Sequence, residues 1–307
     1  IQAGRDLIYI DTQVVGAGTL ELSAGRNFYQ ADSGQLISRG PHTELATSDP
    51  SGGADIVINV GMGEAGPDYQ ALIDAYLDPS NLADPDLALA DQPDKVAKTY
   101  EEELETWLLS RYGGAALDGT DALTYFQALA PEQQRIFLRE VYYAELREGG
   151  REFNDMDGPR YGSYLRGRRM IETLLPEMDS EAGTSGYDGD FTMFTTQDGN
   201  TERSGLIRTE GGGDIQMLVP GGDLIIGLES VRPESGDNGI MTQGSGDIHL
   251  FSQGDIALGL SRIMTTYGGD IFAWSNAGDI NAGRGAKTTL VYTCLLYTSP
   301  SPRDFQV

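Results

Sequence analysis

The chain has 307 residues, of which 39% are hydrophobic, and its 47 acidic and 21 basic residues give a formal net charge of -26. No apolar run approaches the roughly 18 residues that a membrane-spanning helix requires, so we expect no membrane-spanning segment. Binding to phosphates needs clustered Lys and Arg, and this charge balance therefore argues against nucleic acid as a partner.

Residues 1–66 are typical of short strands separated by turns. The sequence Gly-Arg-Asp at residues 4–6 recurs as Gly-Arg-Asn at residues 25–27, which is 21 residues further on. Apolar and alternating runs follow at residues 7–10, 20–22, 28–29, 36–37 and 55–60. A short repeat of this kind indicates a solenoid, in which each coil of the chain stacks on the one before.

The pattern changes to helical spacing in residues 67–180. A first helix is expected to end at Gly113-Gly114, and its apolar face carries Val96, Tyr100, Leu104 and Trp107 at spacings of three and four. Because such faces need a partner, this segment is predicted to be an α-helical insertion that packs on itself or on the solenoid.

Three more helices are predicted in the insertion. Thr120-Asp121 is expected to cap a short helix through residue 129, and residues 167–175 form the last helix before Pro176. Between them, Pro131 opens a helix that is expected to end at Gly149-Gly150, with an apolar stripe at Phe137, Val141 and Ala144.

In residues 181–292 a Gly-Asp-apolar motif recurs, usually followed by a four- or five-residue strand. The aspartates fall into two interleaved series with a predicted period of 24 residues; they are Asp190, Asp214, Asp223, Asp247, Asp255, Asp270 and Asp279. The expected strands begin at residues 191, 215, 224, 248, 256 and 271. A period of this size, with two strands and a third expected, matches one coil of a parallel β-helix.

The aspartates themselves are predicted to be structural. Glycine supplies the corner dihedral angles of a coil, and a neighbouring carboxylate holds the bend by accepting backbone N–H groups. Calcium binding is the alternative, but the nonapeptide spacing of calcium-binding solenoids is missing.

Residues 293–307 are expected to be foreign to the protein. Residues 294–304 resemble a translation of a transposase adapter used in sequencing libraries, so Cys294 would not be a native residue. The chain also begins at Ile1 without a methionine, and we expect a fragment of a longer reading frame.

The run from Gly268 through Trp274 to Thr288 resembles a motif near the end of exoproteins of the filamentous haemagglutinin family. Residues 129–147 resemble the helical insert of the same region. The resemblance implies a right-handed parallel β-helix that Gram-negative bacteria export through an outer-membrane partner transporter, by two-partner secretion. It also implies an extracellular or cell-surface location, and adhesion to a host or neighbouring-cell receptor or glycan.

Two alternatives remain open: a β-helical polysaccharide lyase or hydrolase, and a signalling or secretion-related module. Such enzymes need a carboxylate cluster with a basic residue, or paired carboxylates with a histidine. The only histidines are His42, beside Pro41, and His249, which alternation places on the outside of a strand. We therefore expect no enzyme, and assign no catalytic, cofactor-binding or metal-binding residue.

Three further groups of residues have both a functional and a structural interpretation. The four arginines Arg160, Arg166, Arg168 and Arg169 form either an anion or polysaccharide site or, as we favour, a solvated helix face paired with acids. The run Gly211–Gly213 lacks the context of a phosphate loop. The aromatic residues Tyr142, Tyr143, Tyr267 and Trp274 would either stack on sugars or pack internally.

Overall fold

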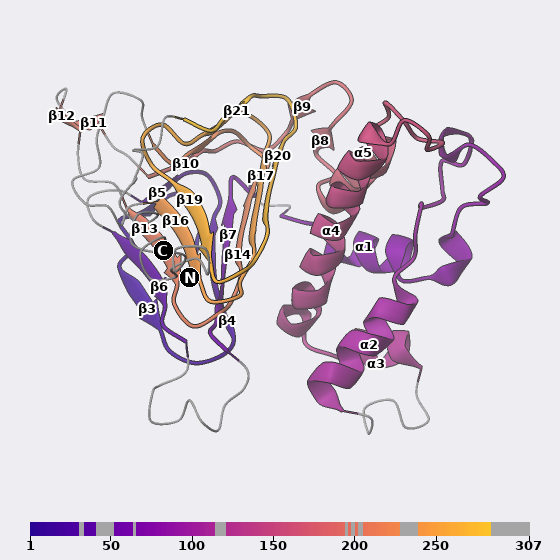
Figure 1. The fold of residues 1–307 in the computed structure, drawn as a ribbon, viewed down its shortest axis with the longest axis horizontal. Helices are drawn as coiled ribbons and strands as arrows, with labels where there is room; N and C mark the ends of the chain where they lie inside the picture. The colour runs from indigo at the N-terminus through magenta and orange to yellow at the C-terminus, as the bar shows by residue number, and fades with distance from the viewer. Residues whose placement is uncertain are drawn as a thin grey trace, which may run out of the picture.

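The computed structural model describes residues 1–30, 34–40, 52–63, 66–113, 121–193, 196–197, 200–201, 205–227 and 239–283. Figure 1 shows two parts side by side, a stack of β-coils and a group of helices. The helices lie along one side of the stack.

Within the described residues, the strands of the coils form three sheets in which all neighbours are parallel, and each complete coil gives one strand to each sheet. The first sheet contains β1 (Gln2–Ala3), β4 (Thr19–Ala24), β7 (Asp55–Val60), β14 (Ile215–Val219), β17 (Ile248–Ser252) and β20 (Ile271–Ser275). The second contains β2 (Leu7–Ile8), β5 (Phe28–Tyr29), β10 (Phe191–Thr192), β15 (Leu224–Ile225), β18 (Ile256–Ala257) and β21 (Ile280–Asn281). The third contains β3 (Thr12–Val14), β6 (Gln35–Ser38), β13 (Leu206–Thr209), β16 (Gly239–Gln243) and β19 (Ile263–Thr266). The predicted parallel β-helix, including its third strand, is confirmed.

The interior of the solenoid is a column of apolar side chains. Alternate residues of the first sheet point inward, so that Leu20, Ile56 and Ile215 stack in register on one another. In the second sheet, Phe28 and Phe191 are both fully buried, and their rings meet edge to face with centroids 5.4 Å apart. Residues on either side of the insertion therefore share one core.

The repeated aspartates form two ladders that run along the stack. In each ladder, a side-chain oxygen accepts the backbone N–H of the equivalent residue in the next coil, at donor–acceptor distances of 2.7–3.1 Å. One ladder contains Asp55, Asp214, Asp247 and Asp270; the other contains Asp6, Asn27, Asp190, Asp223, Asp255 and Asp279. The predicted structural role of the aspartates is confirmed. The backbone N–H group that each side chain binds belongs to the neighbouring coil.

The predicted 24-residue period is wrong for most coils. Asp190 and Asp214, which are 24 residues apart, belong to different ladders. The stacked equivalents Asp190 and Asp223 are 33 residues apart, and only the step from Asp255 to Asp279 is 24. The reason is that stacking fixes the strands but not the connections, and the connection between the second and third sheets varies in length. One of these connections carries the antiparallel hairpin of β11 (Thr196–Gln197) and β12 (Asn200–Thr201).

The first ladder allows a stability prediction at Asp214. Burial raises the pKa of Asp214 from 3.8 to about 6. The hydrogen bond from the backbone N–H of Asp247 lowers this pKa, whereas the negative charges of Asp55 and Asp247 raise it further. Because the folded pKa lies above the unfolded value, folding loses stability as the pH rises through this window. Asp214→Asn keeps the acceptor oxygen without the charge, as Asn27 does in the other ladder.

We expect Asp214→Asn to raise the free energy of unfolding at pH 7.5 by about 1–2 kcal/mol and to leave it unchanged near pH 4. Urea unfolding at both pH values measures this. Asp214→Ala, which removes the acceptor, should instead cost about 1–3 kcal/mol. Equal effects of the Asn and Ala variants would argue against the ladder.

The insertion interrupts a single coil, between β7 and β10. It contains α1 (Tyr69–Tyr76), α2 (Glu101–Tyr112), α3 (Ala122–Gln127), α4 (Pro131–Asn154) and α5 (Leu165–Leu174), the short 3-10 helices η1 (Pro79–Asn81) and η2 (Leu89–Asp91), and the antiparallel hairpin of β8 (Met178–Asp179) and β9 (Thr184–Ser185). The chain thus leaves the solenoid after a strand of the first sheet and returns at a strand of the second. None of the described helices is both long and apolar enough to cross a membrane.

The predicted helices exist, but their boundaries differ from those expected: α3 ends at Gln127 and not at residue 129, and α5 spans Leu165–Leu174 and not residues 167–175. Gly113, at φ 77°, ends α2 as expected, whereas Val96 precedes the helix and forms a parallel bridge with Leu82. Helix α4 continues through Gly149 to Asn154. The reason is packing: a Cβ on Gly149 would lie 2.9 Å from the backbone nitrogen of Gly167, so this glycine lets α4 and α5 approach closely. Helix α1 was not predicted.

Candidate interaction surface

Helix α4 lies beside the strands of the first sheet (Figure 1). Its contacts run from Glu21 in β4 through Gln216 in β14 to His249 in β17, so the helix crosses the strands. Two buried side chains of that face, Leu218 in β14 and Phe251 in β17, belong to the apolar core of the insertion. Tyr142 of α4 meets Phe251 edge to face, with ring centroids 5.9 Å apart. The insertion is therefore docked on the solenoid through a continuous apolar core.

A polar row of α4 matches a row of outward-facing strand residues. The helix row consists of Arg135, Arg139, Tyr143 and Arg147, spaced four residues apart; the strand row consists of Glu21, Val57, Gln216, His249 and Phe272, in register. Four helical residues rise about 6 Å and neighbouring strands are about 4.8 Å apart, so the two rows stay nearly in step over several coils.

The contacts follow this match from one end of α4 to the other. Arg135 and Arg139 lie 3.8 and 4.0 Å from the carboxylate of Glu21. Arg139 Nε donates to Gln216 Oε1 at 3.0 Å. Tyr143 Oη donates to the carbonyl oxygen of Met217 at 3.0 Å. These bonds pair part of the polar groups that docking buries and favour one register of helix on sheet. Arg135 Nε, Arg139 Nη1 and His249 Nδ1 are buried without a hydrogen-bond partner within the described residues.

His249 lies at the centre of this contact. As predicted it points outward from its strand, and it is only 7% exposed because α4 covers that face of the sheet. Its imidazole stacks on Tyr143 at 4.8 Å, and its Nε2 accepts a 2.8 Å hydrogen bond from Arg147. Burial, and then the charge of Arg147, lower the pKa of His249 to about 4. His42 lies outside the described residues.

The lowered pKa predicts that the docked structure weakens in mild acid. The folded pKa lies below the unfolded value of 6.5, so this stability is complete above pH 6.5 and is lost as the pH falls through about 4. Between pH 7 and 5, the free energy of unfolding of the protein should fall by about 2 kcal/mol more than that of a His249→Gln variant. Urea unfolding across this range tests it; parallel pH profiles for the two proteins would contradict it.

The structure separates the four arginines of the predicted basic patch. Arg160 is paired with Glu152, as expected. Arg166 is also paired, with Glu145 and Glu152, but it is buried, so the solvated face predicted for it is wrong. Arg169 donates to three backbone carbonyl groups, those of Leu89, Gln92 and Lys95.

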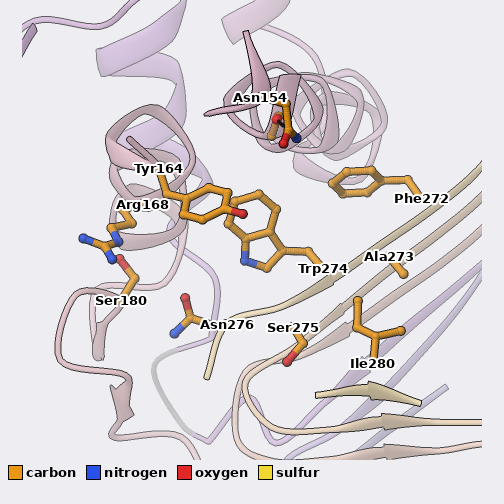
Figure 2. A pocket seen from close by; sticks show the side chains of 11 residues that line it. Asn154, Tyr164, Arg168, Ser180, Phe272, Ala273, Trp274, Ser275, Asn276 and Ile280 are labelled. Atoms are coloured by element: carbon orange, nitrogen blue, oxygen red, sulfur yellow. Dashed lines mark hydrogen bonds between the residues drawn. The ribbon is translucent and has the colours of Figure 1, made fainter. Parts of the chain in front are cut away.

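Arg168 lines a groove where α4 and α5 meet the last described coil (Figure 2). The cavity volume is about 330 Å³, and the lining side chains include Asn154, Tyr164, Ser180, Phe272, Trp274 and Asn276. Of the aromatic residues predicted to stack on sugars or pack internally, Tyr142 and Tyr143 are buried in the docking contact, and Tyr267 is 92% exposed. Trp274 lies in the groove described above.

Metal binding has no support within the described ranges, where no three His, Cys, Asp or Glu side chains are grouped as metal ligands. The run Gly211–Gly213 lies between β13 and β14, at a corner of a coil.

The sequence prediction missed the helix row of α4 that contacts the solenoid, because the residues of this row are polar. Polar helix positions are usually solvated. The apolar residues Phe137 and Val141 instead indicated another face of the same helix as the buried one. A usable signal was present: cationic and aromatic residues repeat every four positions from 135 to 147, and the solenoid strands place Gln216 and His249 in one outward row.

Comparison with known proteins gives one match. A model described as filamentous haemagglutinin family outer membrane protein matches residues 268–301, which include β20 and β21. The match covers a short stretch and agrees with the resemblance carried by residues 268–288. Searches of curated proteins and of solved structures found nothing that matches the chain.

Proposed function

We propose that this protein is a non-enzymatic structural and adhesive segment of a large exoprotein that Gram-negative bacteria secrete or display on their surface. The observation that carries the proposal is the stack of parallel coils with a helical insertion docked along one face. A rod of this kind offers long lateral surfaces and does not need a closed active site. The family match over residues 268–301 supports the same class of protein.

Export through an outer-membrane partner transporter and adhesion to a host or neighbouring cell complete the proposal. Their support is the resemblance to the family. A β-helix can fold coil upon coil because each coil contacts only its neighbours, which suits a chain that emerges gradually from a transporter.

A β-helical polysaccharide lyase or hydrolase is the competing function. Asp214 has the raised pKa of a general acid, but its Oδ1 accepts the backbone N–H of Asp247. His249 is buried beneath α4, and its Nε2 is occupied by Arg147. Both groups already have structural roles, which favours adhesion over catalysis.

An assay for turnover tests this choice. The purified protein is incubated with polygalacturonate, and unsaturated uronate products are followed by their ultraviolet absorbance. We expect no product, together with binding of the complete exoprotein to host or neighbouring cells. Product that disappears when the carboxylates of Asp255 and Asp279 are changed to amides would reverse the assignment.

A signalling or secretion-related role for the insertion has one observation in its favour. Leu82, Leu87 and Tyr161 are large apolar residues that are 50%, 58% and 58% exposed. They line one groove, and Figure 1 shows the segment between α1 and α2 on the side of the helices away from the coils. Exposed apolar side chains that lie together are typical of a contact surface.

Deleting residues 68–176 would expose Leu218 and Phe251, and aggregation would obscure the result. A test that avoids aggregation changes Leu87 and Tyr161 to Asp and leaves the helix row of α4 unchanged. Unchanged surface display with a lost downstream response would support signalling. Unchanged response would leave adhesion as the function of the solenoid.

A further inference from the structure

Arg168 differs from the neighbouring arginines in its environment. Arg160 and Arg166 are paired with carboxylates, and Arg169 is bonded to carbonyl groups. Arg168 is half-buried and has no acidic partner within the described residues. A guanidinium group is planar and binds a carboxylate through two parallel hydrogen bonds. An unpaired guanidinium in a groove is therefore suited to an anionic ligand.

The lining of this groove is unusual for so acidic a protein. Although the chain has 47 Asp and Glu residues, none of the lining residues is Asp, Glu, His or Lys. A carboxylate that enters the groove meets the positive charge of Arg168 and no lining group of like charge. The same composition leaves no side chain suited to act as a general base near neutral pH, which favours binding over turnover.

Aromatic rings form part of the groove wall. Trp274 meets Tyr164 edge to face, with centroids 5.4 Å apart. The outer edge of the indole packs on α5, where a Cβ on Gly167 would lie 2.9 Å from Trp274 Cη2. Figure 2 shows Arg168, Ser180 and Asn276 together on one side of the indole ring, with Phe272 on the other. The apolar C–H faces of a sugar ring pack well against such a wall.

The groove also holds unused hydrogen-bonding atoms. Asn154 Nδ2 donates to the carbonyl of Gly150, and Asn276 Nδ2 donates to Gln253 Oε1. Both Oδ1 atoms lack a donor within the part of the chain that the structure describes. Trp274 Nε1 is shielded from water and lacks an acceptor there. Two acceptors beside an aromatic wall suit hydroxyl groups.

We propose that this groove binds a sugar that carries a carboxylate, with Arg168 pairing the carboxylate, Trp274 packing against the sugar ring, and Asn154 and Asn276 accepting hydrogen bonds from its hydroxyls. The inference rests on the proposed function, since it names a ligand class for the adhesive surface. A volume of about 330 Å³ lies at the small end of ligand sites and suits one or two sugar units.

The indole N–H signals test the proposal directly. The chain has two tryptophans, Trp107 in the insertion core and Trp274 in the groove, and Trp274→Phe assigns their signals in a nitrogen–proton correlation spectrum. The probes are D-galacturonate and D-galactose, which differ in the carboxylate. We expect galacturonate to shift the Trp274 signal but not that of Trp107, and to bind about tenfold more tightly than galactose.

Variants of Arg168 provide the control. Arg168→Gln should weaken galacturonate binding about tenfold, to the level of galactose, and Arg168→Lys should give an intermediate value. Arg151→Gln, at a position 67% exposed and outside the groove, should change nothing. If Trp274→Phe fails to fold, comparing the spectra of the unchanged protein with and without Trp107→Phe assigns the same two signals.

Two results would overturn the inference. Equal affinity for galacturonate and galactose would remove the role of Arg168, and an unmoved Trp274 signal with both sugars would remove the site. Neither result bears on the turnover assay or on cell adhesion, which test the proposed function separately. Conversely, cleavage of polygalacturonate by a protein whose Trp274 signal still responds to galacturonate would refute the non-enzymatic role alone.

Discussion

Replacing Arg166 with Met is expected to lower the free energy of unfolding of the insertion by about 3–5 kcal/mol. Arg166 Nε donates to Glu145 Oε2 at 2.8 Å, and Glu145 is 0% exposed. Without the guanidinium, the carboxylate keeps only the 2.6 Å hydrogen bond from Tyr100 Oη. A buried charge with so little compensation is strongly destabilising.

The measurement is urea unfolding followed by the helical circular dichroism signal, because the described helices all lie in the insertion. The double variant Arg166→Met with Glu145→Gln should recover most of the loss, since the amide still accepts from Tyr100 without carrying a charge. The matched control is Arg151→Met, which removes an exposed pair with Glu148 and should cost under about 0.5 kcal/mol. A loss as small as this in Arg166→Met would contradict the buried pair.

The second large effect is expected at Phe191, in the first solenoid strand after the insertion. Phe191→Ala should destabilise the solenoid by about 3–5 kcal/mol, because it leaves a cavity and removes the ring contact with Phe28. Urea unfolding followed by a strand-sensitive infrared band measures this loss.

A partly exposed phenylalanine gives the control for Phe191. Phe153→Ala also removes a ring contact, a stacked pair with Tyr164 at 4.0 Å, but at a half-buried position of the insertion. It should cost less than half as much as Phe191→Ala. A cost below about 1 kcal/mol for Phe191→Ala would mean that the ring does not lie in a packed interior.

The strands and corners of the solenoid were predictable because their determinants are local. Glycine, aspartate and a short apolar run specify one corner and one strand, so Asp247 followed by Ile248 needs no distant information. The inward positions followed from alternation, as in β14, where Ile215 and Met217 point to the core.

The pairing of coils was less predictable, because it depends on contacts between residues far apart. Asp55 and Asp214 are adjacent in one ladder although 159 residues separate them. A constant period could not reveal this, since the insertion and the variable connections change coil length without changing the stack.

The candidate groove was hardest to predict. The sequence indicated Arg168 and Trp274 separately, but gave no reason to place them together or to separate Arg168 from Arg166. Their proximity depends on the docking of α4 and α5 on β20, which uses tertiary contacts such as that of Arg147 with His249.

Cysteine cross-linking across the insertion tests the central claim most directly. In a background with Cys294→Ser, Tyr29→Cys and Thr192→Cys occupy in-register positions of β5 and β10, on either side of the insertion. Parallel neighbours lie about 4.8 Å apart, within the reach of a disulfide. We expect oxidation to link this pair and not the pair of Tyr29→Cys with Ile225→Cys, which lies two coils away. No link between residues 29 and 192, or a stronger link between 29 and 225, would contradict a solenoid that resumes in register after its insertion.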